Sequence, residues 1–395
     1  MIKSRIMTTK RYLQNDILTD ALADRKMAFI SGPRQVGKTY LAKQCLDADA
    51  NYFNWDVAAF KKVWIRSPLS AIEQIGSGPV VFDELHKYPH WKNSLKGLYD
   101  QVGKQVPIIV TGSARLDLYK KGGDSLLGRY IPYRLHPFTV GERSDSSHDP
   151  DRLEVGKIAY PLNDLIAYSG FPEPLLGGSK KKARRWSRLR LEQLVREDIR
   201  DFSNIRNIEL IKLLVELIPD RVGSPLSINS LREDLQVAYA TVREWIAILQ
   251  NLYICFRVLP YSRNISRALT KESKYYLFDW MSIKAQGALL ENIVAVHLQK
   301  ACHYWTDLAY DKFELRYIRT REKQEVDFCI VREETPWMLV ECKSQSTVIS
   351  SSLRKFSDLF ATARVFQVTS ADVDRIIPGS RIRLMNIEKF LSMFP

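Results

Sequence analysis

The residues with the clearest chemical signature lie near the N-terminus. Residues 32–39 read Gly-Pro-Arg-Gln-Val-Gly-Lys-Thr, which fits the spacing G-x-x-x-x-G-K-[ST], and the apolar run 27–30 precedes them. Glycines let backbone N–H groups curl around phosphate oxygens, and a following helix adds the positive end of its dipole. In such a loop Lys38 reaches the β- and γ-phosphates of a nucleotide, and the Thr39 hydroxyl holds Mg²⁺. The residues expected to bind the nucleotide are Gly32, Pro33, Arg34, Gln35, Val36, Gly37, Lys38, Thr39 and Tyr40.

Two carboxylates and the end of a further strand supply the groups that hydrolysis requires. Asp83 and Glu84 follow an apolar run, where Asp83 can position a hydrated Mg²⁺ and Glu84 can polarise the attacking water. The next apolar run leads to Thr111 and Ser113, either of which can sense the γ-phosphate, and the sequence does not choose between them. Arg129 can act as an arginine finger on a neighbouring subunit's nucleotide, or pair locally at the surface.

A second set of carboxylates lies in the C-terminal third. Asp327 falls in an alternating run, and Glu341 and Lys343 end another, so that the last two share a strand face. With Asp327 they could hold one or two Mg²⁺ ions, and a helix upstream adds Glu291. This order resembles the PD-(D/E)xK nuclease pattern, with Val326 in place of the proline before the aspartate. The alternatives are a nuclease-like fold kept for DNA binding or structure, and a plain charged β-hairpin.

The middle of the chain has the spacing of a helix-turn-helix. Apolar positions in residues 227–252 fit two helices separated by a turn at 236–238. Strand-like runs at 253–258 and 274–278 complete a winged-helix pattern. A winged helix can bind DNA or serve as a packing or protein-contact module, and acidic residues dilute the positive charge of this one. In the DNA-binding interpretation the contacts would come from Thr241, Arg243, Arg263 and Arg267.

A dense run of positive charge precedes this region. Residues 180–190 read Lys-Lys-Lys-Ala-Arg-Arg-Trp-Ser-Arg-Leu-Arg. Such a run can bind a phosphate backbone or form a solvated helix face, and the sequence favours neither. The whole chain carries 59 Lys and Arg against 45 Asp and Glu, a formal net charge of +14. That excess points to a polyanionic partner, with nucleic acid preferred over a lipid surface.

The hydrophobic pattern supplies the elements that would bring these groups together. Between residues 26 and 140 short apolar runs alternate with helical stretches, which indicates βαβ units and a parallel sheet. Residues 143–158 are polar and rich in turn formers, and mark a loop or boundary. We therefore expect an α/β protein with a doubly wound parallel sheet in 1–145, a helical and winged-helix domain in 160–275 and a nuclease-like α/β domain in 276–395.

Composition narrows the class of protein. The chain has 395 residues, of which 45% are hydrophobic and 26% charged, and this balance excludes wholesale disorder. Its five cysteines form no CxxC pair, which argues against a disulfide scaffold and a zinc ribbon. The first ten residues lack the apolar core of a signal peptide, and no run approaches the roughly 18 apolar residues of a membrane span. We expect a cytoplasmic protein that is neither secreted nor inserted in a membrane.

Several of these motifs together resemble a known family. The segments GPRQVGKT, NWD at 54–56, VVFDELHKYP, IIVTGSARLDL and LLGRYIPYRLHPFTVGE look like the prokaryotic AAA-type P-loop ATPases of the subgroup that carries a C-terminal domain of unknown function. The resemblance extends over nearly the whole chain. It implies a doubly wound α/β core and the following roles: Lys38 and Thr39 for nucleotide and Mg²⁺, Asp83 and Glu84 for hydrolysis, Ser113 or Thr111 as sensor, and Arg129 as the arginine of the family's Gly-Arg pair.

Taken together, the sequence predicts a cytoplasmic Mg²⁺-dependent ATPase that uses ATP hydrolysis to bind or remodel DNA, and that works as an oligomeric ring. One alternative is an ATP-gated, Mg²⁺-dependent DNA nuclease in defence or repair. The other is a nucleotide-switched regulatory protein that acts through protein contacts and does not touch DNA. Salt-dependent DNA binding separates the last of these from the first two.

Overall fold

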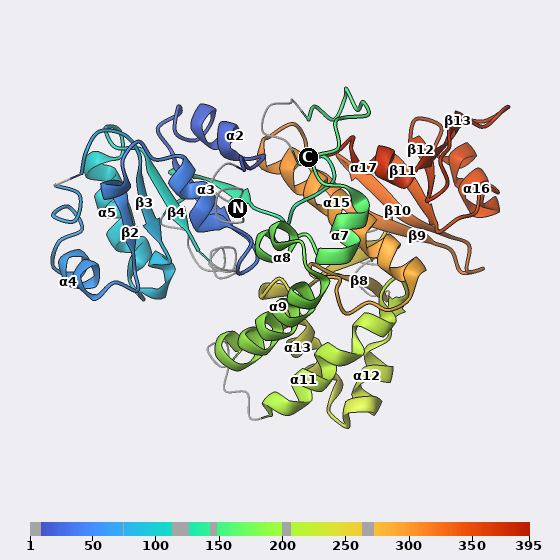
Figure 1. Ribbon diagram of the computed structural model, residues 1–395, viewed down its shortest axis with the longest axis horizontal. Coiled ribbons are helices and arrows are strands. Elements are labelled where there is room, and N and C mark those ends of the chain that lie inside the picture. Colours follow the sequence, from blue (N-terminus) through green and yellow to red (C-terminus); the bar gives the residue numbers. More distant parts are fainter. Residues whose placement is uncertain (1–8, 74, 113–125, 143–147, 200–206, 263–271) are drawn as a thin grey trace. The chain divides into compact units, whose positions relative to one another are not determined.

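The computed structural model describes residues 9–73, 75–112, 126–142, 148–199, 207–262 and 272–395 (Figure 1). The chain forms two compact units. Unit 1 holds the described residues up to Pro137, and unit 2 holds Phe138–Glu142 together with the described residues from 148 onward. Three predicted site residues lie outside the described residues, namely Ser113, Arg263 and Arg267.

Unit 1 is built on a five-stranded parallel sheet with the strand order β2-β3-β4-β1-β5. The apolar runs of the sequence become strands whose residues in β1, β3 and β4 are all buried, as expected for a parallel sheet covered by helices. The predicted α/β class and parallel sheet are thus confirmed. The elements are β1 (Met27–Ser31), β2 (Tyr52–Asn54), β3 (Val80–Asp83), β4 (Ile108–Thr111), β5 (Tyr130–Arg134), α2 (Gln14–Thr19), α3 (Lys38–Gln44), α4 (Ala58–Arg66) and α5 (Trp91–Val102).

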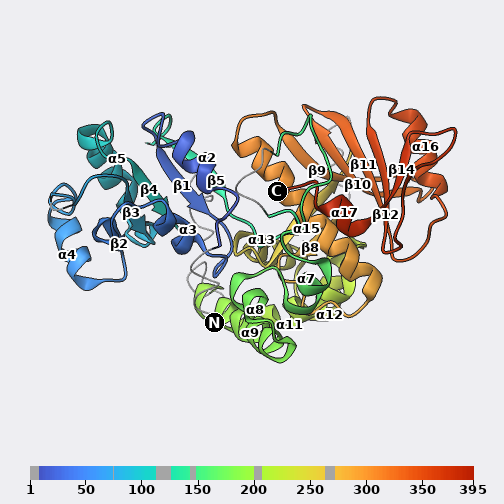
Figure 2. The ribbon, with the colours of Figure 1, turned by 45° about the horizontal axis from the view of Figure 1, so that its top comes forward.

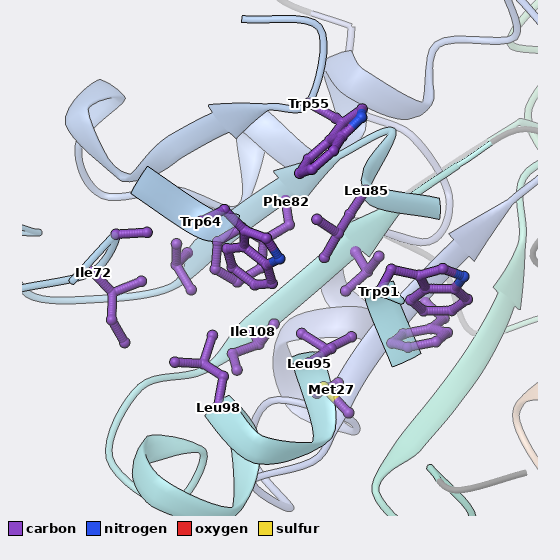
Figure 3. Close-up of a cluster of buried hydrophobic side chains, with 14 of the residues drawn as sticks. Met27, Trp55, Trp64, Ile72, Phe82, Leu85, Trp91, Leu95, Leu98 and Ile108 are labelled. Carbon is purple, nitrogen blue, oxygen red and sulfur yellow. The ribbon is translucent and has the colours of Figure 1, made fainter. Parts of the chain in front are cut away.

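An aromatic core fixes the strand that carries the acidic pair. Phe82 is fully buried, and its ring lies 4.8 Å from that of Trp64 on α4, measured between centroids (Figure 3). The same cluster includes Trp91 and Leu95 of α5. A buried aromatic side chain contributes about 2–3 kcal/mol through its removal from water alone. This packing therefore also fixes the backbone of Asp83, which is the next residue along β3.

Unit 2 contains a nine-stranded mixed sheet with the order β13-β14-β12-β11-β10-β9-β7-β8-β6. The strands predicted for the wing, β7 and β8, pair antiparallel with each other, and β7 also pairs in parallel with β9. The wing strands thereby extend the C-terminal sheet. The strands are β6 (Pro225–Leu226), β7 (Cys255–Pro260), β8 (Ser273–Leu277), β9 (Phe313–Arg319), β10 (Glu325–Arg332), β11 (Thr335–Lys343), β12 (Arg364–Thr369), β13 (Asp374–Ile376) and β14 (Ile382–Asn386).

The helices of unit 2 form two groups. Those between residues 162 and 251 contact mainly one another, and those from residue 286 onward pack against the sheet. The longest, α15, packs against β8, β9, β10 and β11 and lies beside this sheet (Figure 2). Among the described residues, no helix is at once long and apolar enough to span a bilayer. The helices are α7 (Leu162–Tyr168), α8 (Pro172–Gly177), α9 (Lys180–Gln193), α11 (Ile208–Leu217), α12 (Ile228–Leu235), α13 (Tyr239–Asn251), α15 (Gln286–Asp307), α16 (Ser351–Leu359) and α17 (Ile387–Leu391).

The two helices predicted from the helix-turn-helix spacing are present. The Ser227 side chain caps the start of α12 by accepting from Ser230 N, and Gln236, whose φ of 53° lies in the left-handed region, forms the C-cap after Leu235. The predicted apolar positions Leu231 and Val242 are fully buried, one on each helix. The assignment of these elements to a winged helix stays a prediction.

A short strap, Phe138–Glu142, runs along α15 within unit 2. Val140 N donates a hydrogen bond to His297 Nε2 (3.0 Å), so this nitrogen must be unprotonated. Burial lowers the pKa of His297 to about 3, which keeps the imidazole neutral. One turn further along α15, Lys300 Nζ donates to Thr139 Oγ1 (2.8 Å) and pairs with Glu142. The side chains of Lys300 and Glu142 are 0% and 1% exposed, so this is an ion pair without access to water.

We predict that Lys300→Met lowers the free energy of unfolding of unit 2 by about 3–5 kcal/mol, because it leaves the Glu142 carboxylate buried without this cation. Hydrogen exchange of the α15 amides measures this loss separately from unit 1. The double variant Lys300→Met/Glu142→Gln should recover most of the stability, since neither charge of the pair remains. A double variant as unstable as the sum of its two single changes would contradict this account.

Candidate functional site

The phosphate loop connects β1 to α3 and depends on two glycines. A Cβ at Gly32, whose φ is 144°, would lie 2.3 Å from Leu135 O, so no other residue fits there. Gly37 has a φ of 99° and forms the N-cap of α3. Both positions use backbone angles that side chains disfavour. The two glycines therefore allow a tight loop that leads directly into the N-terminus of α3. A tight loop before a helix N-terminus is the usual geometry of an anion-binding site.

Lys38 places its charge inside this loop. Its Nζ donates hydrogen bonds to Gly32 O (3.0 Å) and Pro33 O (2.8 Å), and the residue is only 7% exposed. Both of these acceptors are neutral carbonyls. Phosphate oxygens are stronger acceptors for an ammonium than carbonyls are, because they are charged. A phosphate could therefore compete with these carbonyls for the ammonium, and phosphate binding by Lys38 stays a prediction.

Asp83 connects the loop helix with the ends of two neighbouring strands. Its Oδ2 accepts from Thr39 Oγ1 (2.9 Å) and Tyr52 OH (2.6 Å), and its Oδ1 accepts from the Thr111 hydroxyl. The parallel register pairs Asp83 with Thr111 and with Asn54. The structure therefore brings together Thr39 and Asp83, the pair predicted to hold Mg²⁺. Hydroxyl and carboxylate oxygens are the donors that Mg²⁺ prefers, so these residues fit the ion.

Glu84 follows Asp83 with a φ of 58°, a left-handed conformation at which strand β3 has ended. Its carboxylate lies 3.6 Å from Lys87 Nζ and 3.8 Å from His86 Nε2. Burial raises the pKa of Glu84, although the charges of Lys38 and Lys87 oppose that shift. A carboxylate made more basic in this way is suited to accept a proton from water near neutral pH.

Two residues that the sequence analysis did not identify hold this site together. Arg11 is 1% exposed and donates to Val36 O in the loop (2.7 Å) and to His136 O beyond β5 (2.6 Å). Tyr52 is the third donor to Asp83. Neither belongs to the loop motif: Arg11 precedes α2 and Tyr52 begins β2, and no motif in the sequence singles them out.

The remaining predicted nucleotide-binding residues occupy the loop and the first turn of α3. Arg34, Gln35 and Val36 lie between the two glycines, and Gln35 has a left-handed φ of 67°. Tyr40 lies on α3, where its OH accepts from Gln44 Nε2 (3.1 Å). Burial raises the pKa of Tyr40, so its hydroxyl stays protonated.

Arg129 lies where the strands of the sheet begin, whereas the phosphate loop lies where they end. Its carbonyl accepts from Met27 N (2.9 Å) at the start of β1, while the loop follows the end of that strand. At about 3.3 Å per residue, β1 separates the two by about 15 Å, more than an arginine side chain can reach. The guanidinium pairs with Asp100 through Nε (2.8 Å) and Nη2 (3.2 Å) and remains partly exposed. Arg129 is thus too distant to act on the phosphates of its own chain.

The predicted carboxylates of unit 2 come together at one end of α15. Glu291 lies on this helix, Asp327 on β10, and Glu341 and Lys343 on β11. Lys343 pairs with Glu341 (2.7 Å), and Asp327 Oδ2 accepts from the backbone N of Cys342 (2.9 Å).

A further lysine, not identified from the sequence, lies among these carboxylates. The Nζ atom of Lys274 on β8 is 2.6 Å from Glu325, 3.2 Å from Glu291 and 3.5 Å from Asp327. Tyr276 OH also donates to Glu291 (2.7 Å). We refer to Lys274, Glu291, Glu325, Asp327, Glu341 and Lys343 as the carboxylate cluster.

The electrostatics of the carboxylate cluster are those of crowded, buried acids. Burial, followed by the charge of Asp327, raises the pKa of Glu291 and that of Glu341 to about 7. Burial opposes the charge of Lys274, but the surrounding carboxylates outweigh it and raise its pKa, so the ammonium stays charged. Glu341 Oε2 is buried with no hydrogen-bond partner among the described residues.

The cluster as arranged does not fit a divalent metal ion. Three of its four carboxylates, those of Glu291, Glu325 and Asp327, converge on the Lys274 ammonium, while that of Glu341 pairs with Lys343. Within the described ranges, no group of three or more His, Cys, Asp or Glu side chains is arranged to hold a metal.

A basic surface lies on α9. The cations at 180, 181, 182, 184, 185 and 188 are exposed, whereas Ala183, Trp186 and Arg190 form the buried face. Of the predicted DNA contacts within the described residues, Arg243 is exposed and Thr241 is half-buried, both on α13.

Unit 1 thus has a parallel α/β sheet with a phosphate-loop motif between β1 and α3, and comparison with known families agrees with this arrangement. Residues 24–144 match a family described as an AAA domain. Residues 160–282 and 286–390 match two domains of unknown function, DUF8612 and DUF4143. The phosphate loop, the parallel sheet and the first match support an AAA-type P-loop ATPase in this unit.

The relatives of the whole chain carry no assigned activity. An uncharacterized protein of Methanocaldococcus jannaschii is 24% identical over 337 residues, which are 79% of this chain and 74% of that protein. One of Haemophilus influenzae is 23% identical over 78% of this chain and 82% of its own length.

Two solved structures show a weak similarity. The Aeropyrum pernix ORC1 protein in complex with DNA has a TM-score of 0.33 and 16% identity, over 73% of this chain and 97% of that one. The Thermotoga maritima RuvB Holliday junction branch migration motor also has a TM-score of 0.33, with 15% identity over 64% and 93%. Similarity this weak does not establish a common fold for the whole chain.

Proposed function

We propose that this protein is a Mg²⁺-dependent ATPase that couples ATP hydrolysis to the binding or remodelling of DNA, and that it acts as an oligomer. The observation that carries the proposal is the convergence of Lys38, Thr39, Asp83 and Thr111 beside Glu84 at one edge of the parallel sheet. These are the groups that phosphoryl transfer to water requires, and they lie there on rigid elements.

Each residue has a distinct role in this proposal. The N–H groups of the loop and Lys38 bind and orient the phosphates, and Thr39 with Asp83 would hold Mg²⁺, which neutralises phosphate charge when bound. Glu84 accepts a proton from the attacking water. Thr111, whose hydroxyl donates to Asp83, is proposed as the γ-phosphate sensor, and Ser113 is the alternative that the sequence allows.

Hydrolysis is tested by two substitutions with different expected effects. Lys38→Ala should abolish ATP turnover, because the phosphates lose their cation. Glu84→Gln should lower kcat by about 10²–10⁴ and retain nucleotide binding, since it removes only the proton acceptor. Phosphate release and binding of a fluorescent ATP analogue measure both. Glu73→Gln, an exposed change of the same kind, is the control. Turnover that survives in Lys38→Ala would place the site elsewhere.

The position of Arg129 supports action on a neighbouring subunit. Since it lies too far from the loop of its own chain, its proposed role as an arginine finger requires an oligomer. The finger stabilises negative charge that develops on the transferred phosphoryl group. In the isolated chain the guanidinium is held by Asp100, which a neighbouring nucleotide would have to replace.

Mixing two inactive variants tests this arrangement. Arg129→Ala alone should lower kcat by about 10³ or more, the scale of arginine fingers. Addition of Lys38→Ala chains, which retain Arg129, should restore part of the activity, because each variant supplies what the other lacks. Asp100→Asn breaks the same surface pair and keeps the arginine, so it should remain active. If mixing restores nothing, Arg129 does not act between subunits.

The proposed DNA contact is supported by the basic surface of α9. Three lysines occupy the first turn of this helix, where the dipole disfavours positive charge by about 0.3–1 kcal/mol each. A phosphate backbone placed there would offset that cost. The net charge of +14 and the exposed Arg243 agree with this interpretation.

DNA binding should weaken steeply with salt, and α9 should account for part of the slope. Arg184→Gln/Arg185→Gln/Arg188→Gln should flatten log K against log salt by about 1 per lost phosphate contact. Fluorescence anisotropy with duplex, single-stranded, forked and four-way DNA measures this with and without nucleotide. Arg321→Gln/Lys323→Gln/Arg354→Gln removes the same charge from exposed positions elsewhere in unit 2 and should have a smaller effect. No binding at low salt would favour the nucleotide-switched regulatory protein.

A further inference from the structure

The carboxylate cluster of unit 2 contains its own cation. The Lys274 side chain is 0% exposed, and its ammonium is within 3.5 Å of the carboxylates of Glu291, Glu325 and Asp327. We propose that Lys274 permanently occupies the position a divalent metal would take between these carboxylates, and that the C-terminal region is therefore a metal-independent module that does not cleave nucleic acid.

The distances leave no separate place for an ion between the same oxygens. Mg²⁺ binds carboxylate oxygens at about 2.0–2.1 Å and Ca²⁺ at about 2.3–2.6 Å, both surrounded by six or more oxygens. An ion at the point where Glu291 and Asp327 converge would contact the ammonium of Lys274 directly. Two cations at that separation in a buried site repel each other strongly, because little water screens them.

The negative charge of the carboxylates is also largely neutralised by neighbouring cations, without a divalent ion. The carboxylates of Glu291, Glu325, Asp327 and Glu341 are matched by three cations. These cations are Lys274, Lys343, which pairs with Glu341 (2.7 Å), and Arg319, which pairs with Glu325 (2.7 Å). With all groups ionised, one negative charge remains over the carboxylate cluster and Arg319 together. A divalent cation would overcompensate it, whereas metal sites ordinarily present a clear excess of carboxylate charge.

The surroundings of Lys274 hold it in this place. Its strand, β8, is buried at every residue and pairs with both β6 and β7. The ammonium also lies 5.5 Å from the centre of the Tyr317 ring, a cation–π contact along the route of the side chain. Tyr276, two residues along the same strand face, donates to Glu291 and holds that carboxylate against the lysine. An exit of Lys274 would leave the half-buried carboxylates of Glu291 and Asp327 without this cation.

The residues of the nuclease-like pattern can therefore be present although the site binds no metal ion. Glu341 retains a buried oxygen, Oε2, with no hydrogen-bond partner among the described residues, and Lys343 remains beside it, as the pattern requires. Removal of the Lys274 charge should then expose a latent site, in which Asp327, Glu291 and Glu341 take up a divalent ion.

The test counts Mn²⁺ ions bound to the full chain without nucleotide, by electron paramagnetic resonance of free Mn²⁺. Wild type and Asp327→Asn should bind the same number of ions. Lys274→Met, close in length and uncharged, should bind about one more, and Lys274→Met/Asp327→Asn should lose that gain. Circular dichroism verifies that each variant is folded. None of these measurements requires ATP turnover, so failure of the ATPase proposal would leave their interpretation unchanged.

Three results would overturn the proposal. The first is a Mn²⁺ ion in wild type that Asp327→Asn removes. The second is a folded Lys274→Met chain that gains no ion. The third is Mg²⁺- or Mn²⁺-dependent cutting of duplex, single-stranded or branched DNA by wild type that Asp327→Asn or Glu341→Gln abolishes. If Lys274→Met does not fold, Lys274→Gln takes its place, and the comparison of wild type with Asp327→Asn decides on its own.

Discussion

One carboxylate, that of Asp83, joins the elements on which the chemistry of unit 1 depends. It accepts hydrogen bonds from Thr39 on α3, Tyr52 on β2 and Thr111 on β4. These donors meet because parallel strands in register end at the same edge of the sheet. The apolar packing around the preceding residue, Phe82, fixes the strand, so the position of the acid follows from the core behind it.

The loop and its acidic partners could be predicted from the sequence because their signals are local. Gly32, Gly37, Lys38 and Thr39 lie in one short motif, and the strand that carries Asp83 is a continuous apolar run. Arg11 could not be predicted in the same way. It braces the loop through backbone carbonyls, which any sequence provides, and the chain folds it back over a long separation.

In unit 2 the sequence predicted that Glu291, Asp327 and Glu341 approach one another, but it predicted neither Glu325 nor the lysine that lies between these carboxylates. Alternation on β10 and β11 was sufficient to place Asp327 near Glu341. Lys274 was missed because its strand belonged to the predicted wing, and the continuity of this strand with the C-terminal sheet arises from the β7–β9 pairing. The sequence nonetheless contains an indication of this contact. Lys274 precedes the apolar run Tyr-Tyr-Leu-Phe, and a lysine in a strand that is buried along its whole length requires carboxylate partners.

The two buried lysines of the candidate sites differ in how readily a ligand can replace their present hydrogen-bond acceptors. Lys38 donates to two neutral carbonyls of the loop, and a charged phosphate competes easily with such acceptors. Lys274 lies within 3.5 Å of three carboxylates, which are charged acceptors already. In the first arrangement a charged ligand can compete with the two carbonyls for the ammonium, whereas in the second the ammonium is bound to carboxylates of the fold. Chemistry in this chain is therefore expected where a buried cation is held by acceptors that a charged ligand can replace.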